Sequence, residues 1–250
     1  MVRIFPLSIL TYAPAYSKCL TKAQIYGIVY LMDYYKKQRS IFVYIIPVVL
    51  ALLAAFLVYK SGRRNAIAGL GEPVQTPESG HFERTFGEWK MNFDYEYAYD
   101  IEALVIHTKN YPETDVGGKM APKDLALAWG TVAAYNKSID FHWGQSNRWY
   151  HWYADTYAEI APVSLPGIDA ETSVSIQSAN THVIAADSSV KRTISRIRRG
   201  DHVHLKGYLV NISGSTSGGR TFSWNSSVTR YDTGGGSCEV FYVTSAQILP

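Results

Sequence analysis

The sequence predicts an α+β fold that is mainly β, a small barrel or sandwich of the OB-like or SH3-like kind, which follows one N-terminal transmembrane helix. An uncharged apolar run covers residues 41–59. Beyond it, short segments in which apolar and polar residues alternate are separated by glycine and proline. Helical periodicity is sparse among them, and many short strands with few helices are typical of small barrels and sandwiches.

Residues 41–59 read IFVYIIPVVLALLAAFLVY. A helix of this length spans about 28 Å, close to the hydrocarbon thickness of a bilayer. We therefore expect a single-pass membrane protein with a signal-anchor. Three basic residues flank the run closely on each side, and Arg3, Lys18 and Lys22 tip the count toward the N-terminal side. We therefore expect residues 1–40 in the cytoplasm and the C-terminal domain outside it, in the periplasm of a Gram-negative cell. A cleaved signal peptide is the alternative, because residues 66–68 (Ala-Ile-Ala) resemble a cleavage site.

The segments on either side of the run differ from the rest of the chain. A start at Met32 would place a basic stretch directly before the apolar run, as in a well-formed signal-anchor. Translation can therefore start at Met32, which would leave out residues 1–31, or at Met1, in which case these residues form a short cytoplasmic or interfacial extension. Gly, Pro and Ser are frequent between residues 60 and 83, which predicts a flexible linker before a β-rich domain over residues 84–250.

Periodicity predicts the main elements of this domain. Apolar and polar residues alternate from Tyr95 to Ile106, which indicates a half-buried strand. We expect a short helix over 122–129 that begins at a proline and ends before a glycine, and a strand over 172–176. Helical spacing predicts a helix capped by Ser188 or Ser189, and strands follow over 203–209, 222–228 and 238–243.

The composition limits the classes of function. Hydrophobic residues make up 47% of the 250 residues and charged residues 18%, and the net charge is +3. This charge is too small to indicate a nucleic-acid-binding protein, and we expect no such partner. The two cysteines, Cys19 and Cys238, lie on opposite sides of the apolar run. The domain therefore has no internal disulfide, and its stability has to come from its core.

Four C-terminal motifs resemble those of uncharacterised bacterial proteins with a single N-terminal membrane helix and a C-terminal β-rich domain. The motifs are Asn180-Thr-His182-Val-Ile, the run from Arg199-Gly-Asp201 to Gly207, Trp224-Asn-Ser-Ser, and the run from Arg230 to Cys238-Glu. The resemblance covers the C-terminal third best. It implies a bacterial envelope setting and brings no known activity.

The segment from Phe141 to Tyr153 is dense in aromatic side chains interleaved with polar ones. Its candidate binding residues are Trp143, Arg148, Trp149 and Trp152. Exposed rings with polar neighbours form stacking surfaces for sugars and peptides. The alternative is an irregular aromatic lid over the core.

Four residues are candidates for a catalytic site: Cys238, His182, Arg230 and Asp201. A cysteine hydrolase or transpeptidase pairs a thiolate with an imidazole and with a cation for the developing charge. The order of a histidine, a Gly-Asp pair and a late cysteine is similar to that of sortases. In sortases the arginine follows the cysteine, whereas Arg230 precedes Cys238. We favour the alternative, in which Cys238 is a small apolar residue at the start of a buried strand.

The leading hypothesis is a non-enzymatic envelope module that binds a protein partner or a cell-wall component through the aromatic segment. The alternative is a cysteine-dependent hydrolase or transpeptidase at the membrane surface. His202 and His204 share one strand face, but no third ligand lies near them in the sequence, so we expect no metal and no cofactor. Basic residues also cluster around the second predicted helix. We interpret them as a solvated charged face, with binding of anionic lipid or wall polymer as the alternative. The cluster consists of Lys191, Arg192, Arg196, Arg198, Arg199 and Lys206.

Overall fold

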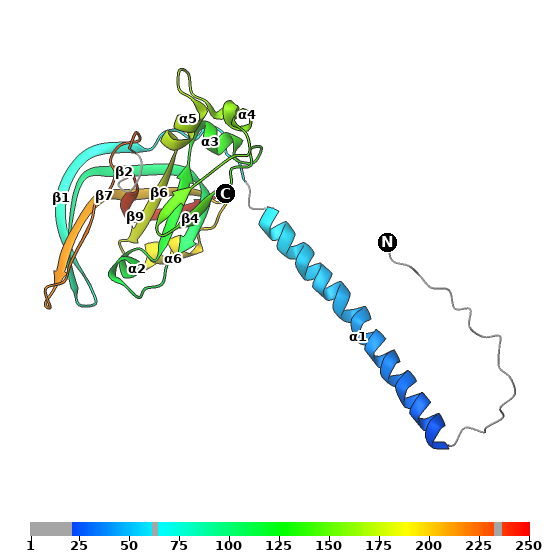
Figure 1. Ribbon diagram of the computed structural model, residues 1–250. Coiled ribbons are helices and arrows are strands. Elements are labelled where there is room, and N and C mark those ends of the chain that lie inside the picture. Colours follow the sequence, from blue (N-terminus) through cyan, green and yellow to red (C-terminus); the bar gives the residue numbers. More distant parts are fainter. Residues whose placement is uncertain (1–21, 62–64, 233–236) are drawn as a thin grey trace. The chain divides into compact units, whose positions relative to one another are not determined.

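The computed structural model describes residues 22–61, 65–232 and 237–250 (Figure 1). The chain divides into two compact units, residues 1–60 and 61–250. In the first, helix α1 covers Lys22–Ser61, and the apolar side chains from Phe42 to Phe56 are exposed. A search of the described residues finds no helix that is both long enough and apolar enough to cross a bilayer. The transmembrane helix predicted over 41–59 is therefore not supported by the structure and stays a prediction.

The C-terminal unit is mainly β, as predicted. Its described residues form one mixed sheet of seven strands. In spatial order these are β1 (Val74–Phe86), β2 (Trp89–Asn110), β3 (Lys123–Ala128), β6 (Ser178–Ala185), β9 (Glu239–Leu249), β7 (His202–Thr216) and β8 (Thr221–Trp224). Strand β7 also pairs with β2, so the pairings run from β2 through β3, β6, β9 and β7 and return to β2. We call this closed set of pairings the five-strand ring.

Strand β2 closes the ring because it is long enough to pair with three neighbouring strands. Residues 89–100 pair with β1, residues 104–110 pair with β3 on the same edge, and the other edge pairs with β7. The strand predicted over 95–106 is confirmed. Its alternation places Tyr99, Ile101 and Ala103 in the buried core, while Glu102 on the opposite face is exposed.

Helix α6 (Ser188–Arg196) connects β6 to β7, as the periodicity predicts. Its N-cap is Asp187, whose carboxylate accepts hydrogen bonds from two backbone N–H groups of the first turn. Val190 and Ile194 lie on one face of the helix and are buried against the core. The apolar spacing thus predicted the helix correctly, but the cap is Asp187 and not Ser188 or Ser189 as predicted.

Two predicted elements are wrong. Residues 122–129, expected to form a helix, contain strand β3, all six residues of which are buried. A central strand that is covered on both faces lacks alternation, so periodicity cannot distinguish it from a buried helix. Residues 172–176, expected as a strand, belong to helix α5 (Ala170–Ile176). The side chain of Asp169 accepts a hydrogen bond from the N–H of Thr172, and this cap begins the helix.

The prediction of a flexible linker over 60–83 is wrong for residues 74–83, which belong to β1. Proline and glycine fit here because β1 is an edge strand whose register shifts between Pro77 and Gly80. The residues before β1 are also held in place. The N–H of Ile67 donates to the carbonyl of Ala133, and Leu70 is buried in the core.

The chain between β3 and β6, residues 129–177, is an insertion that carries most of the remaining elements. These are α3 (Gly130–Tyr135), β4 (Gly144–Ser146), β5 (Trp149–His151), α4 (Tyr157–Ile160), η1 (Ala161–Val163) and α5, and helix α2 (Val116–Met120) precedes β3. In the β4–β5 hairpin, β4 contacts β2 and β5 contacts β6, and β4 lies near β6 in Figure 1. The insertion therefore brings the aromatic segment to the outside of the ring.

Gly207 marks the closest backbone approach within the ring. A Cβ at this position would lie 1.9 Å from the carbonyl oxygen of Tyr242, where the β7–β9 register shifts.

We predict that Gly207→Ala lowers the free energy of unfolding by about 3 kcal/mol, because the neighbouring strand backbone has to move. Gly71, which has open space around it, is the control, and Gly71→Ala should be nearly neutral. Urea unfolding of the full chain, followed by tryptophan fluorescence, measures both, and equal stabilities would contradict this account.

Candidate ligand-binding pocket

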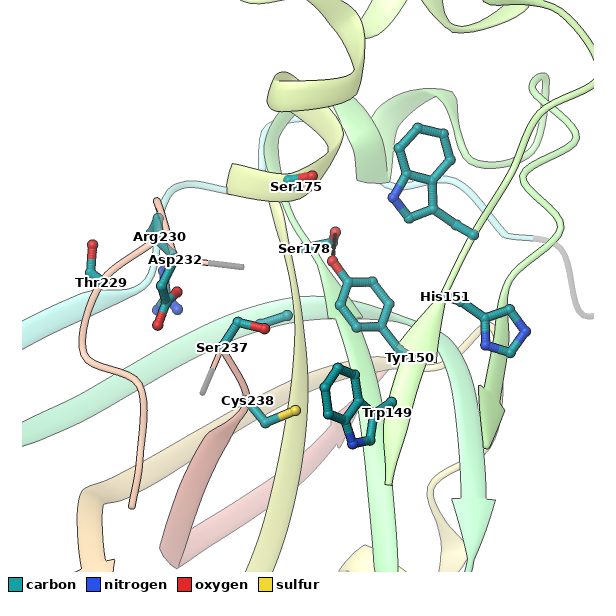
Figure 2. Close-up of a pocket in the computed structure, with 12 residues that line it drawn as sticks. Trp149, Tyr150, His151, Ser175, Ser178, Thr229, Arg230, Asp232, Ser237 and Cys238 are labelled. Carbon is teal, nitrogen blue, oxygen red and sulfur yellow. Dashed lines mark hydrogen bonds between the residues drawn. The ribbon is translucent and has the colours of Figure 1, made fainter. Parts of the chain in front are cut away.

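A pocket of about 300 Å³ opens between the insertion and the segment that precedes β9 (Figure 2). Three parts of the chain line it. Residues 149–152, in and after β5, form one wall, and residues around the start of β6 form a second part. The third part comes from Thr229, Arg230, Asp232, Ser237 and Cys238, which face the aromatic side chains across the pocket. The pocket therefore depends on segments that are far apart in the sequence.

The aromatic wall has one exposed ring and two that are anchored. Trp149 is 50% exposed and lies at the rim. The hydroxyl of Tyr150 is 3.1 Å from the hydroxyl of Ser178, and burial raises the pKa of this tyrosine. Trp152 is partly buried and meets Phe141 edge to face, with ring centroids 6.1 Å apart. Tyr150 and Trp152 are thus held by the core, which leaves the ring of Trp149 free to contact a ligand.

The opposite wall is built around an arginine whose charge is already neutralised. Arg230 forms an ion pair with Glu239, a carboxylate with no exposed surface at the start of β9. The hydroxyls of Tyr99 and Thr181 donate to the same carboxylate at 2.8 and 2.7 Å. The guanidinium also lies over the ring of Trp129, 5.1 Å from its centroid. Burial acts to lower the pKa of Arg230, but the adjacent negative charge of Glu239 raises this pKa by more than burial lowers it. The arginine therefore stays charged.

The turn of the β4–β5 hairpin has an unusual backbone. Its two central residues, Asn147 and Arg148, have φ angles of 49° and 65°, a range that residues other than glycine rarely adopt. Two consecutive positive φ angles are the geometry of a two-residue turn that matches the twist of a hairpin. Each such residue costs about 1 to 2 kcal/mol. The contacts of Arg148 have to offset this cost.

Arg148 makes contacts through both its backbone and its side chain. Its guanidinium lies 3.0 Å from the buried carboxylate of Asp124 and donates to the carbonyl of Ala121. The same group lies over the rings of Tyr111 and Trp224, 4.2 and 5.2 Å from their centroids. Arg148 therefore inserts beside β3 as an anchor for the hairpin, and it is absent from the pocket lining.

A chain of buried amides extends this anchor to the pocket. The side chain of Asn180 in β6 donates to the carbonyl of Arg148 at 2.8 Å and accepts from Gln145 at 2.5 Å. Gln145 in turn lies 2.9 Å from a ring nitrogen of His107. The Asn180 amide is also 3.4 Å from the sulfur of Cys238. One asparagine thus joins the hairpin, β6 and the segment before β9.

The structure brings together only two of the four catalytic candidates. Arg230 and Cys238 both line the pocket. His182 is buried, with Nδ1 3.0 Å from a carboxylate oxygen of Asp124, and its ring packs on Trp224. Asp201 lies at the turn before β7, where it accepts a hydrogen bond from the N–H of Arg198. The predicted constellation of all four side chains is therefore not formed.

Cys238 lacks the environment of a nucleophile. Burial raises the pKa of its thiol, and the carboxylates of Asp124, Glu239 and Asp232 raise it further, against a hydrogen bond from Asn180 that lowers it. A nucleophilic cysteine needs the opposite shift, because the thiolate is the reactive form. Cys238 is partly buried and directly precedes β9, next to the position expected of a small apolar residue at the start of a buried strand.

The four binding candidates have different positions. Trp149 and Trp152 line the pocket. Trp143 is buried, and its indole N–H donates to the side chain of Asn136 at 2.8 Å. The aromatic segment is therefore partly a lid over the core and partly a pocket wall. The sequence reasoning missed Asp232 and Ser178, because these residues approach the segment only through the tertiary fold.

Comparison with protein-family models, curated proteins and solved structures finds no match to this chain. The kind of ligand is therefore inferred from the residues that line the pocket.

The two strand histidines form carboxylate pairs. His202 and His204 lie 2.8 and 2.6 Å from Glu102 and Asp100. Partial burial acts to raise the pKa of Asp100, but hydrogen bonds from Lys206 and His204 prevail and lower it. Within the described part of the chain, no group of three His, Cys, Asp or Glu side chains is arranged to hold a metal ion.

We predict that the Cys238 thiol is unreactive in the folded protein. In a Cys19→Ser background at pH 7.5, alkylation by iodoacetamide should be at least about tenfold slower in buffer than in urea, because the thiolate is scarce and shielded. The rate should rise with pH, with a midpoint above that of the unfolded chain, since burial raises the pKa of this thiol. Folded-state labelling as fast as that in urea would instead indicate an activated nucleophile.

Proposed function

We propose that the five-strand ring is a barrel of the OB type. Numbered along the chain, its strands are β2, β3, β6, β7 and β9, and the pairings give the order 1-2-3-5-4-1. The third and fifth strands, β6 and β9, are parallel, and the other pairs of the ring are antiparallel. Helix α6 lies between the third and fourth strands. This combination of order, direction and helix position is the topology of a five-stranded Greek-key OB barrel.

OB barrels bind ligands over their second and third strands, next to the loops that connect strands 1 and 2 and strands 4 and 5. The pocket uses the start of the third strand and part of the connection between the fourth and fifth strands. Its remaining wall comes from the insertion between the second and third strands. This position supports a binding role for the pocket.

We infer that the protein is a non-enzymatic envelope module that binds a cell-wall component in this pocket. The observation that carries the proposal is the half-exposed ring of Trp149 at the rim of a cavity in which five of the other eleven lining residues carry a hydroxyl group. Ligand pockets combine aromatic surface with a few polar groups that set orientation. The raised pKa of Cys238 disfavours the alternative of a cysteine hydrolase or transpeptidase.

We further propose that the apolar run within α1 attaches the protein to a bilayer. The run carries no charge from Ile41 to Tyr59, and its described side chains are exposed to solvent in the isolated chain. An exposed apolar surface of this extent needs a cover, and lipid is the cover that suits a charge-free helix. Basic residues before the run support an extracytoplasmic C-terminal unit.

Two tryptophans provide a matched test of the binding proposal. Trp143→Ala should lower the free energy of unfolding by about 3 to 5 kcal/mol, because the ring is buried. Trp149→Ala should change it by no more than about 0.5 kcal/mol, yet reduce retention of soluble fragments from digested bacterial cell wall on the immobilised full chain. Retention that is equal in the wild type and in Trp149→Ala would refute the binding site. Selective retention of an envelope protein instead would identify a protein partner.

Membrane attachment has its own test. In spheroplasts, we expect the protein to sediment with membranes, because the uncharged run stays in lipid. Added protease should digest the C-terminal unit without lysis, since positive charge keeps the N-terminal side inside. Removal of the peripheral proteins with carbonate is the control for loose association. Recovery in the soluble fraction, or protection of the C-terminal unit until lysis, would contradict this arrangement.

A further inference from the structure

The pocket walls carry an unbalanced negative charge. The positive charge of Arg230 is neutralised by Glu239, which has no exposed surface. Asp232 also lines the pocket, and it forms no hydrogen bond or ion pair with any other residue that the structure describes. Residues 233–236, which follow it, are Thr-Gly-Gly-Gly and add no ionisable side chain. With the buried Glu239 counted beside the lining residues, Arg230, Glu239 and Asp232 contribute +1, −1 and −1, which leaves a net charge of about −1 from these three groups.

Aromatic rings occupy the wall opposite this carboxylate. Figure 2 shows Trp149 and Tyr150 on the side of the pocket that faces Asp232 and Cys238. Aromatic faces are electron-rich and attract cations that approach within about 6 Å of the ring centre. A carboxylate on one side and electron-rich rings on the other both favour a positively charged group between them. An anionic group would be repelled by the carboxylate of Asp232, and it would share Arg230 with Glu239.

We propose that the pocket recognises an alkylammonium group, a protonated or quaternary amine carried by its ligand. The ammonium lies between Asp232 and the ring of Trp149, and the lining hydroxyls contact the rest of the ligand. This inference rests on the proposed binding function and specifies its chemistry: the bound wall component bears an amine. A cavity of about 300 Å³ has room for one such group with its neighbouring atoms.

Choline and its uncharged carbon isostere, 3,3-dimethyl-1-butanol, separate charge from shape. We expect choline to shift the indole N–H signal of Trp149 in NMR titrations of the full chain, and to bind at least about tenfold more tightly than the isostere. Trp149→Phe assigns the signal. Asp232→Asn should weaken choline binding about tenfold and leave the isostere unchanged. Glu96→Gln removes an exposed carboxylate outside the pocket lining and should have no effect.

The other outcomes separate this inference from the binding function on which it rests. If choline binds no more tightly than the isostere, or equally well to Asp232→Asn, the ammonium inference is overturned. If choline does not bind but neutral N-acetylglucosamine shifts the Trp149 signal, the inference fails and the binding function stands. If neither these probes nor the cell-wall fragments perturb Trp149, both fail. Circular dichroism spectra show whether each variant keeps its fold.

Discussion

The buried carboxylate of Glu239 is the interaction on which the C-terminal unit depends most. It lies at the start of β9 and accepts from Tyr99 in β2 and Thr181 in β6, so three strands of the ring meet at one charge. Arg230 supplies the compensating cation. A buried charge without its partner costs about 3 to 5 kcal/mol, which makes all four groups interdependent. The same pair holds the segment before β9 against the five-strand ring, and this segment is one wall of the pocket.

Arg148 performs the corresponding role for the opposite wall. Its ion pair with Asp124 and its contacts with two rings hold a hairpin turn in a strained backbone conformation. Strain of this kind persists only where surrounding contacts over-determine it, and it occurs often beside binding sites. The amide of Asn180 connects this anchor to Cys238 on the other wall. The pocket is thus held open from both sides by buried polar contacts, which reduces the ordering that a ligand has to induce.

The sequence predicted those parts of the fold that have pure periodicity. Strand β2 and helix α6 each expose one face, so apolar spacing identified both. Strand β3 is buried on both faces, so its sequence does not alternate between apolar and polar residues. In α5, Thr172, Val174 and Ile176 recur at every second position, which led to the wrong prediction of a strand. The cap at Asp169 was the overlooked indication. In the site, Trp149 and Trp152 were predicted because they lie in one aromatic segment. Asp232 belongs to a distant segment, and only the closed ring of strands brings it to the same pocket.

The charge arrangement explains why two arginines near one pocket do not make it an anion site. Each guanidinium is paired with a carboxylate that has no exposed surface, Arg148 with Asp124 and Arg230 with Glu239. Desolvated pairs of this kind hold structure in place, because breaking either one leaves a buried charge unpaired. The cations therefore act as anchors of the walls. The lining offers a ligand aromatic surface, hydroxyl groups and the carboxylate of Asp232, which has no ion-pair partner among the described residues.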